Sequence, residues 1–306
     1  MRKLLRQIQH ARDLLTNVID ERMDKRARVY VDVQHGLGNR IRALISAKLL
    51  AEKSGRRLVV IWRPDMHCQA EFRDLFEDNN LDVRSDFTSN ARARSDIYNY
   101  MDNEVGAEKG KRIDHHSPRD IYVKSAYVLN HQYSDFAAEN EVLRRLVIRS
   151  EVLQTANESD VSNRVGIHVR MGGGKGYDQS PWNRPENWSQ KGQEEMYYWR
   201  ERSHFTVFFS EIDRRLSEDP SLQFFLATDR EETYDAFRQR YGEKIAYARR
   251  QVFDRSIEQQ RFALIDMVLL SRTRYILGSN WSSFTEIAHR LGNTPVFYSG
   301  VDFGAK

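Results

Sequence analysis

Cysteine is almost absent from this sequence of 306 residues, since Cys68 is the only one. A single cysteine cannot form a disulfide bond within the chain, which makes a reducing compartment the expected location. No run approaches the roughly 18 apolar residues that a membrane-spanning helix requires, and the N-terminus lacks the apolar core of a secretory signal. With 40% hydrophobic and 30% charged residues, the composition is typical of a globular protein. We therefore expect a cytoplasmic protein.

Excess positive charge is also missing beyond the first 28 residues. That segment carries eight Lys or Arg and four Asp or Glu, and its balance of +4 equals the net charge of the whole chain. Because the remainder is neutral, nucleic acid is not an expected partner. Leu4, Ile8, Leu15 and Val18 recur near helical spacing in this basic segment. We expect a helix that packs on its own domain or on a partner chain; the alternative is a surface helix in peripheral contact with the anionic lipid of the inner membrane.

A metal-binding pattern is absent as well. The sequence contains no Asp-x-Asp, and His115, His116 and His131 show no spacing that is typical of metal ligands. Cationic side chains and a helix dipole can stabilise a departing diphosphate in place of a metal ion. We therefore expect neither a metal nor a cofactor.

Strand and helix patterns alternate along the chain. The first half predicts strands at Val29–Val33 and Arg57–Ile61 around a helix over about Asn39–Lys53, with Gly55 at its C-terminus. Residues 64–118 show no sustained period and are interpreted as an irregular segment, either a long functional insertion or a mobile cover. A strand pattern within residues 120–129, a helical pattern over residues 140–156 and a polar linker at residues 157–163 follow.

The second half alternates more regularly. Strands are predicted at Arg164–Val169, Gln223–Thr228, Lys244–Ala248, Tyr275–Leu277 and Pro295–Tyr298. Helices are predicted at about His204–Leu216, Glu231–Arg240, Ile257–Ser271 and Ser283–Leu291. This alternation favours an α/β fold with parallel sheets covered on both faces, and the length suggests two domains, at residues 1–160 and 161–306. Ligands of such sheets bind beyond the carboxyl ends of strands.

The first of these strand ends carries a glycine turn. Gly36 and Gly38 follow the strand, and Asn39 and Arg40 begin the helix. Glycine allows a close approach of the backbone to a ligand, and a helix start offers free amide groups. The dinucleotide fingerprint is not met, because Ile41 occupies the position of its third glycine. A plain strand-to-helix turn is the alternative.

The next strand end carries Arg170, followed by four glycines within residues 172–176 and by Lys175. Arginine binds phosphate through two parallel hydrogen bonds, and a flexible glycine run could close over a ligand. The Walker pattern is not met, because Gly176 follows Lys175 and Val169 occupies the first glycine position. The alternative is a structural ion pair of Arg170 beside a surface glycine loop.

Two further strand ends complete the set. Asp229 either accepts hydrogen bonds from a ribose or base, or caps the next helix together with Glu232. Ser282 and Ser283 begin a helix, where free amides and the helix dipole favour phosphate; the alternative is ordinary N-capping. The four signals lie on one edge of one predicted sheet, which could hold a nucleoside diphosphate.

Several of these segments resemble a known family. "GIHVRMGGGKGYD", "FFLATD" and "ALIDMVLLSRTRYILGSNWSSFTEIAHRLG" resemble the three motifs of the fucosyltransferases that include the rhizobial nodulation, core α1,6- and protein O-fucosyltransferases. "GLGNRIRALISAKLLAEKSGRRLVVIW" is similar to their N-terminal turn and helix. The resemblance spans about residues 29–292 without the middle region. It implies a GT-B-type architecture, two Rossmann-like domains across a cleft, and metal-independent, inverting transfer of L-fucose from GDP-fucose to a glycan acceptor.

The resemblance also implies roles for the candidate residues. Arg170 would contact the β-phosphate and assist its departure, and Asp178, eight residues further, matches the presumed catalytic base of the core enzymes. Met171 departs from those enzymes, which carry a second arginine there, and Lys175 would compensate. His168 and Asp229 would lie near the guanine nucleoside, and Ser282 and Ser283 would contact the diphosphate. The sugar or the acceptor would be faced by Gly36, Gly38, Asn39 and Arg40. The alternatives are a transferase of this fold that uses another nucleotide-sugar, and a nucleotide- or glycan-binding module without catalysis.

Overall fold

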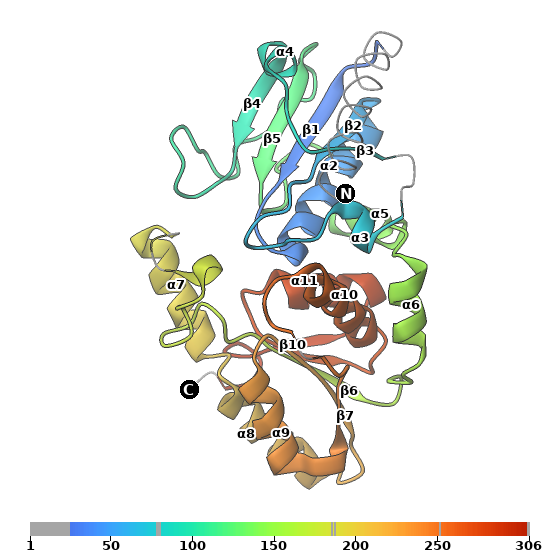
Figure 1. Ribbon diagram of the computed structural model, residues 1–306, viewed down its shortest axis with the longest axis vertical. Coiled ribbons are helices and arrows are strands. Elements are labelled where there is room, and N and C mark those ends of the chain that lie inside the picture. Colours follow the sequence, from blue (N-terminus) through green and yellow to red (C-terminus); the bar gives the residue numbers. More distant parts are fainter. Residues whose placement is uncertain (1–24, 78–80, 185, 187, 251, 305–306) are drawn as a thin grey trace, which may run out of the picture.

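The computed structural model describes residues 25–77, 81–184, 186, 188–250 and 252–304 (Figure 1). The basic helix expected near the N-terminus falls on residues 1–24, which lie outside this range, so it stays a prediction. None of the helices in the described ranges is long and apolar enough to span a membrane.

The first half of the chain forms a parallel sheet of five strands in the order β3-β2-β1-β5-β4. Its strands are β1 (Arg28–Val33), β2 (Arg57–Ile61), β3 (Asp82–Arg84), β4 (Ser95–Asn99) and β5 (Asp120–Ser125). Every residue of the central strand β1 is buried, as expected for a parallel strand with both faces covered. Tyr30 of β1 pairs in register with Val59 on one side and Tyr122 on the other.

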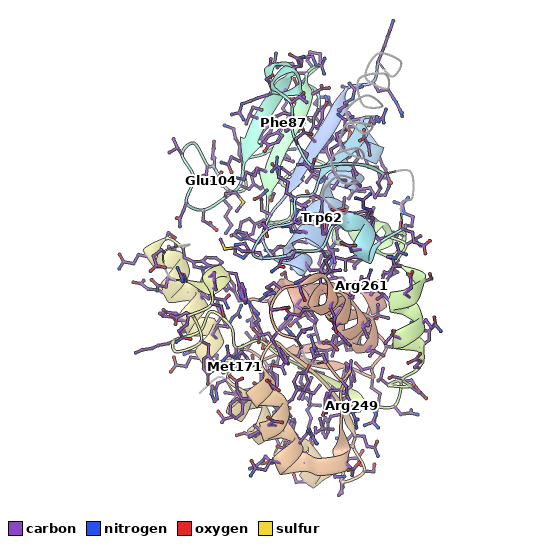
Figure 2. All side chains as sticks on the ribbon, viewed as in Figure 1. Trp62, Phe87, Glu104, Met171, Arg249 and Arg261 are labelled. Carbon is purple, nitrogen blue, oxygen red and sulfur yellow. The ribbon has the colours of Figure 1, made fainter. Side chains whose placement is uncertain are left out.

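Residues 64–118, predicted as an irregular segment, provide both edge strands of this sheet, so that prediction was wrong. Strand β3 has three residues, and β4 has the polar sequence SDIYN with only part of it buried, so neither produces an apolar period. The region also contains α3 (Phe72–Leu75) and α4 (Ser89–Arg94). The α3 segment is held by the rings of Phe72 and Phe76, whose centroids lie 5.6 and 6.5 Å from that of Trp62. Figure 2 labels Trp62 beside this segment.

Helix α2 (Leu37–Ser54) follows β1 and begins two residues earlier than predicted. Gly55 ends it as expected, with a left-handed φ of 67° and with its amide directed at the last carbonyls of the helix. The helical pattern over residues 140–156 is divided between α5 (Phe136–Arg144) and α6 (Ser150–Asn157).

The second half forms another parallel sheet of five strands, in the order β10-β9-β6-β7-β8, and all five predicted strands are confirmed. They are β6 (Val165–Val169), β7 (Phe224–Thr228), β8 (Ile245–Ala246), β9 (Ile276–Gly278) and β10 (Val296–Tyr298). The four predicted helices are α8 (Phe205–Glu218), α9 (Glu231–Tyr241), α10 (Ile257–Ser271) and α11 (Ser283–Gly292). Helix α7 (Gln190–Glu201) and the short 3-10 turns η1 (Pro181–Asn183) and η3 (Gly242–Lys244) were not predicted.

Helices α10 and α11 lie between the two sheets (Figure 1). Helix α11 packs against α2, and α10 packs against α6, so elements from both halves share contacts. One apolar cluster accordingly includes Leu44 of α2, Val268 of α10 and Ile287 of α11. The α/β class with two parallel sheets is confirmed, whereas the domain boundary at residue 160 stays a prediction.

Candidate active site

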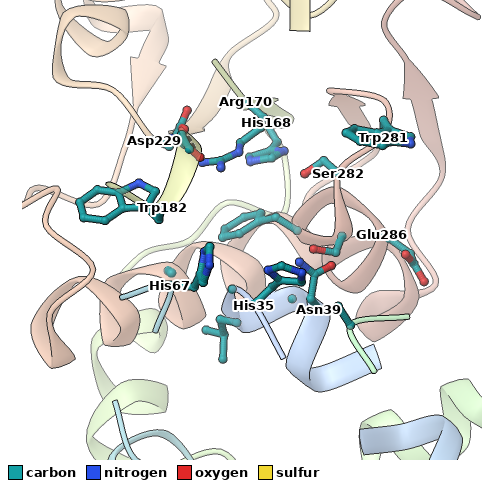
Figure 3. Close-up of a pocket in the computed structure, with 18 of the residues that line it drawn as sticks. His35, Asn39, His67, His168, Arg170, Trp182, Asp229, Trp281, Ser282 and Glu286 are labelled. Atoms are coloured by element: carbon teal, nitrogen blue, oxygen red, sulfur yellow. Dashed lines mark hydrogen bonds and ion pairs between the residues drawn. The ribbon is translucent and has the colours of Figure 1, made fainter. Parts of the chain in front are cut away.

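A cavity of about 530 Å³ lies where strands of both sheets end (Figure 3). Its walls include residues that follow β1, β6, β7 and β9, which is the edge that the strand-end rule selects. Most of the candidate residues line it: Gly36, Gly38, Asn39, His168, Arg170, Asp229, Ser282 and Ser283. Arg40, Lys175 and Asp178 are not among its lining residues.

Backbone strain is concentrated at this cavity. Four non-glycine residues in the described ranges have a left-handed φ, and His35 (63°), Arg255 (64°) and Trp281 (53°) line the cavity. The fourth, Asn293, ends α11. Non-glycine residues keep such conformations where the surrounding structure enforces them, and they cluster at functional sites. The strained residues therefore lie at the same cavity that the strand-end rule selects.

Arg170 and Asp229 form an ion pair at the centre of the cavity wall. The Asp229 carboxylate also accepts hydrogen bonds from the backbone amides of Met171 and Gly172, both at 2.9 Å. Burial works against its ionisation, but Arg170 and the two amides outweigh burial and lower the pKa of Asp229 to about 2. Asp229 does not cap α9, whose N-cap is Arg230, so the capping alternative was wrong. Its contacts tie it to Arg170 and to the glycine loop.

Four more arginines line the cavity: Arg42, Arg200, Arg250 and Arg255. Burial and then repulsion from Arg170 lower the pKa of Arg200 to about 9 and that of Arg255 to about 10. Arg200 donates to the carbonyls of Gly172, Asn280 and Trp281 at 3.2–3.4 Å, which joins two of the strand-end loops. Like charges held this close favour a bound anion, because an anion relieves their repulsion.

Asp266 is a buried carboxylate of this cavity that sequence reasoning did not select. It pairs with Arg250, which also donates to the Tyr234 hydroxyl at 2.6 Å. Burial raises the pKa of Asp266 to about 6 despite the arginine. Its Oδ1 has no hydrogen-bond partner among the described residues. Buried polar atoms are rarely left unpaired, so Oδ1 is available to a ligand donor.

His168 is 3% exposed and stacks on Phe284 with ring centroids 4.4 Å apart. Burial lowers its pKa to about 3, which keeps the ring neutral. The Thr285 hydroxyl lies 3.0 Å from the Ser279 carbonyl, to which it donates its proton, and 2.7 Å from His168 Nδ1. Nδ1 must therefore be the protonated nitrogen, and Nε2 is the acceptor.

The start of α11 faces the cavity through Ser282 and Ser283. Ser282 is the N-cap residue, but its side chain makes no capping hydrogen bond. Ordinary N-capping, the alternative for this position, is therefore not what the hydroxyl does in this structure. The α11 amides and the start of α2, which also lines the cavity, supply two helix N-termini whose dipoles favour an anion.

Arg40 has a different place from the one expected. It is fully buried, and its guanidinium donates to the carbonyls of His35 at 2.8 Å and Arg63 at 2.7 Å and pairs with Asp65 at 2.8 Å. Because the helix begins at Leu37, Arg40 lies in its first turn and points back beneath the loop. It supports the strained His35 from behind instead of facing a sugar, whereas Asn39 does line the cavity.

The glycine run after Arg170 is packed rather than flexible. Gly172, Gly173 and Gly174 are buried, and hydrogen bonds of 2.8–3.1 Å among Met171, Gly173, Gly174 and Tyr177 form a tight turn. Lys175 is exposed. Asp178 accepts a hydrogen bond of 2.5 Å from Tyr197 of α7, so it ties this loop to the helix. Closure of this loop over a ligand stays a prediction.

Sequence reasoning also missed Arg250, Arg255, His67 and Trp281 as cavity residues. Arg250 and Arg255 follow β8, so the strand-end rule, applied to the strand predicted at residues 244–248, points to them. Within the described part of the chain, no three His, Cys, Asp or Glu side chains gather in a way that could hold a metal ion.

No protein-family profile matches the sequence, and no curated protein matches it. Solved structures do match. Fucosyltransferase NodZ from Bradyrhizobium superimposes with a TM-score of 0.55 at 18% identity over 87% of this chain and 93% of that one. POFUT1 in complex with GDP superimposes with a TM-score of 0.54 at 12% identity, over 91% of this chain and 100% of that one. A mutant of Arabidopsis thaliana FUT1 in complex with GDP superimposes with a TM-score of 0.53 at 14% identity, over 91% of this chain and 73% of that one. The chain thus shares the fold of these solved structures.

Proposed function

We propose that the protein is an inverting, metal-independent glycosyltransferase that transfers L-fucose from GDP-fucose to a glycan acceptor. The observation that carries the proposal is the cluster of the cavity arginines Arg170, Arg200, Arg250 and Arg255 beside the start of α11. It fits a diphosphate, and it lies at the carboxyl edge of the second sheet. The fold supports the donor, since NodZ alpha-1,6-fucosyltransferase was soaked with GDP-fucose and POFUT1 was crystallised with GDP and with GDP-fucose.

The diphosphate would lie between Arg170, Arg255 and the amides at Ser282 and Ser283. Departure of GDP places negative charge on the β-phosphate, and fixed positive groups lower the energy of that state. Arginine charge and two helix dipoles supply this stabilisation from the protein itself, which supports a reaction without a metal ion. Asp229, held by backbone amides, would keep Arg170 aligned before the donor binds.

The nucleoside would be recognised deeper in the cavity. The unpaired Oδ1 of Asp266 accepts from the N1–H or the 2-amino group of guanine. Nε2 of His168 is a second acceptor, suited to a ribose hydroxyl or a base N–H. The strained turn at His35 and Asn39 would then face the fucose and the acceptor. The cytoplasmic location, and a peripheral membrane contact through residues 1–28, remain part of the proposal.

The proposal is tested by incubating the protein with GDP-fucose and a panel of glycans in EDTA and determining the linkage of the product. Transfer without added metal and with inverted configuration is expected. Arg170→Lys keeps the charge but removes the planar pair of donors, so its kcat should fall by about 10²–10³. Full activity of Arg170→Lys would contradict the assigned role.

The two alternatives give different results in the same experiments. A transferase of this fold with another donor would turn over a different nucleotide-sugar in a donor-hydrolysis screen. A binding module would be stabilised by GDP against thermal unfolding but would turn over no donor. Absence of both turnover and GDP stabilisation would exclude the nucleotide site altogether.

A further inference from the structure

We propose that Glu195 of α7 is the catalytic base, the group that takes the proton of the acceptor hydroxyl; this inference rests on the proposed function. The candidate that the resemblance selected, Asp178, does not line the cavity and is bound to Tyr197. An inverting transfer needs a group that can receive this proton as the acceptor attacks. The base must therefore be sought among the cavity residues.

Four carboxylates line the cavity, and three are occupied by arginine. Asp229 pairs with Arg170, and Asp266 pairs with Arg250. Glu286 receives hydrogen bonds from Arg42 at 3.3 Å and from Arg290 at 2.9 Å. A proton on any of these carboxylates would neutralise the partner of an arginine and leave that positive charge uncompensated. Glu195 has no hydrogen bond or ion pair with any described residue, so its carboxylate is free to accept a proton.

The cavity imidazoles are weaker candidates. Burial, followed by repulsion from His67, lowers the pKa of His35 to about 4. Burial also lowers the pKa of His67. Both rings are therefore neutral near pH 7, but a low pKa makes an imidazole a poor proton acceptor. His35 instead stacks on Trp188, with ring centroids 6.0 Å apart and an angle of 6° between the rings.

The packing of α7 determines where Glu195 lies. A Cβ on Gly173 would approach Met196 Sδ to 2.7 Å, and a Cβ on Gly174 would approach Arg200 Cβ to 2.9 Å. The glycine run thus lets α7 dock directly on the loop that follows Arg170. Met196 and Arg200 face this loop, and the neighbouring Glu195 lines the cavity. This contact between α7 and the loop therefore fixes the position of Glu195 relative to Arg170.

Aromatic side chains near α7 form a surface that suits a sugar. Trp188 and Trp281 line the cavity with ring centroids 6.1 Å apart. From the first half of the chain, Tyr127 also lines the cavity, and Lys109 lies over its ring at 3.8 Å. Glu195 and Tyr127 line the same cavity, so residues from both halves of the chain surround this surface. A glycan stacked there presents hydroxyl groups to Glu195.

The reaction step is then complete in atoms and charge. The acceptor oxygen attacks the anomeric carbon of fucose from the side opposite the diphosphate. The bond from that carbon to the β-phosphate oxygen breaks, and its electron pair stays on GDP. The hydroxyl proton passes to a carboxylate oxygen of Glu195. Because Glu195 is exposed, it returns the proton to solvent after the product leaves.

The test compares three variants in transfer assays and in GDP titrations. Glu195→Gln should lower kcat by about 10²–10⁴ and leave the Kd for GDP unchanged. It should also abolish the fall of kcat/KM on the acidic side of the pH profile. Glu194→Gln is the matched control, since Glu194 lies on the same helix outside the cavity and accepts from Gln190; it should retain wild-type kcat. Asp178→Asn should retain the acidic limb of the profile.

The inference is overturned if Glu195→Gln keeps more than half of the wild-type kcat. It is also overturned if its Kd for GDP rises by the factor that kcat falls, or if Asp178→Asn loses the acidic limb instead. These failures differ from failure of the proposed function, in which the wild-type protein itself transfers no fucose.

Discussion

Gly38 lies directly against the main chain of Ser283. A Cβ on Gly38 would come within 2.9 Å of the Ser283 carbonyl carbon and carbonyl oxygen, and within 2.8 Å of its hydroxyl oxygen. The starts of α2 and α11 therefore meet at the cavity, one from each half of the chain. Gly38, the second glycine of the turn that follows β1, permits this contact between the two helices. The sequence alone cannot reveal the contact, because Ser283 is 245 positions away.

Gly38→Ala should destabilise the protein, because the added methyl group meets backbone rather than a flexible side chain. Overpacking of this kind costs roughly 1–3 kcal/mol, and the shift of α11 should also weaken GDP binding. Gly36→Ala is the matched control, because its Cβ would meet only Arg255 Nη1, at 4.0 Å. Denaturant titrations of both variants measure the difference. Equal stability of the two variants would show that the close approach is not required.

Asp266→Asn should remove selectivity for the base. Asparagine has no charge, and its amide group supplies one acceptor and one donor in place of two charged acceptors. The guanine donors therefore lose the carboxylate that we propose as their partner. We expect GDP affinity to fall by about 10- to 100-fold, corresponding to roughly 1–3 kcal/mol. Calorimetry with GDP and inosine diphosphate, which lacks the 2-amino group, checks this. The wild-type protein should prefer GDP, and the variant should bind both alike.

A preference for GDP that survives in Asp266→Asn would contradict this assignment. Thr233→Val controls for general disturbance, since Thr233 is buried on α9 next to Tyr234, which contacts Arg250, and does not line the cavity. That variant should keep the wild-type ratio of the two affinities.

The elements that the sequence predicted best are those with apolar runs long enough to show a period. The central strands β6 and β7, with five buried residues each, belong to this group, and α10 was predicted with its observed bounds, Ile257–Ser271. The edge strands β3 and β4 escaped because they are short and polar, and their pairing with β2 and β5 is a tertiary property. The local sequence pattern therefore does not identify an edge strand that is defined by its pairing with a neighbouring strand.

The residues of the candidate site also fall into those that the sequence could locate and those that it could not. Arg170, Asp229 and Ser282 follow strands directly, so the strand-end rule placed them at the cavity. It could not give the direction of a side chain, and Arg40 therefore points beneath the loop although its neighbour Asn39 lines the cavity. Glu195 depends on the docking of α7 on a glycine turn. No spacing rule relates positions 173 and 195, so only the three-dimensional structure selects this residue.

Stability should fall on acidification because of buried neutral histidines. His131 is 4% exposed, and burial lowers its folded pKa to about 4 from an ordinary value of 6.5. Between these values the unfolded chain binds more protons, so the free energy of unfolding rises with pH from about 4 to 6.5, and this histidine adds no slope outside that window. For this histidine alone, the slope should be on the order of 1 kcal/mol per pH unit.

The contribution of His131 is measured by the difference in slope between wild type and His131→Gln across pH 4.5–6.5. The raised pKa of Asp266, about 6, acts in the opposite direction, because its contribution is lost as pH rises through that value. It is common to both proteins and cancels in the difference. His116→Gln, at an exposed position, serves as control and should keep the wild-type slope. An unchanged slope in His131→Gln would refute the prediction.

Arg290→Ala should be the most destabilising of these substitutions. Arg290 is fully buried and joins α11 to α5 through Glu139 at 2.8 Å and Asn140 at 2.7 Å, with Glu139 itself only 3% exposed. Its removal leaves a buried carboxylate without a counter-charge, which costs roughly 3–5 kcal/mol. Arg145→Ala removes a comparable ion pair with Glu52, but that arginine is 55% exposed and should contribute at most about 1 kcal/mol. Denaturant midpoints that place both variants at equal stability would show that the Arg290 pair is hydrated.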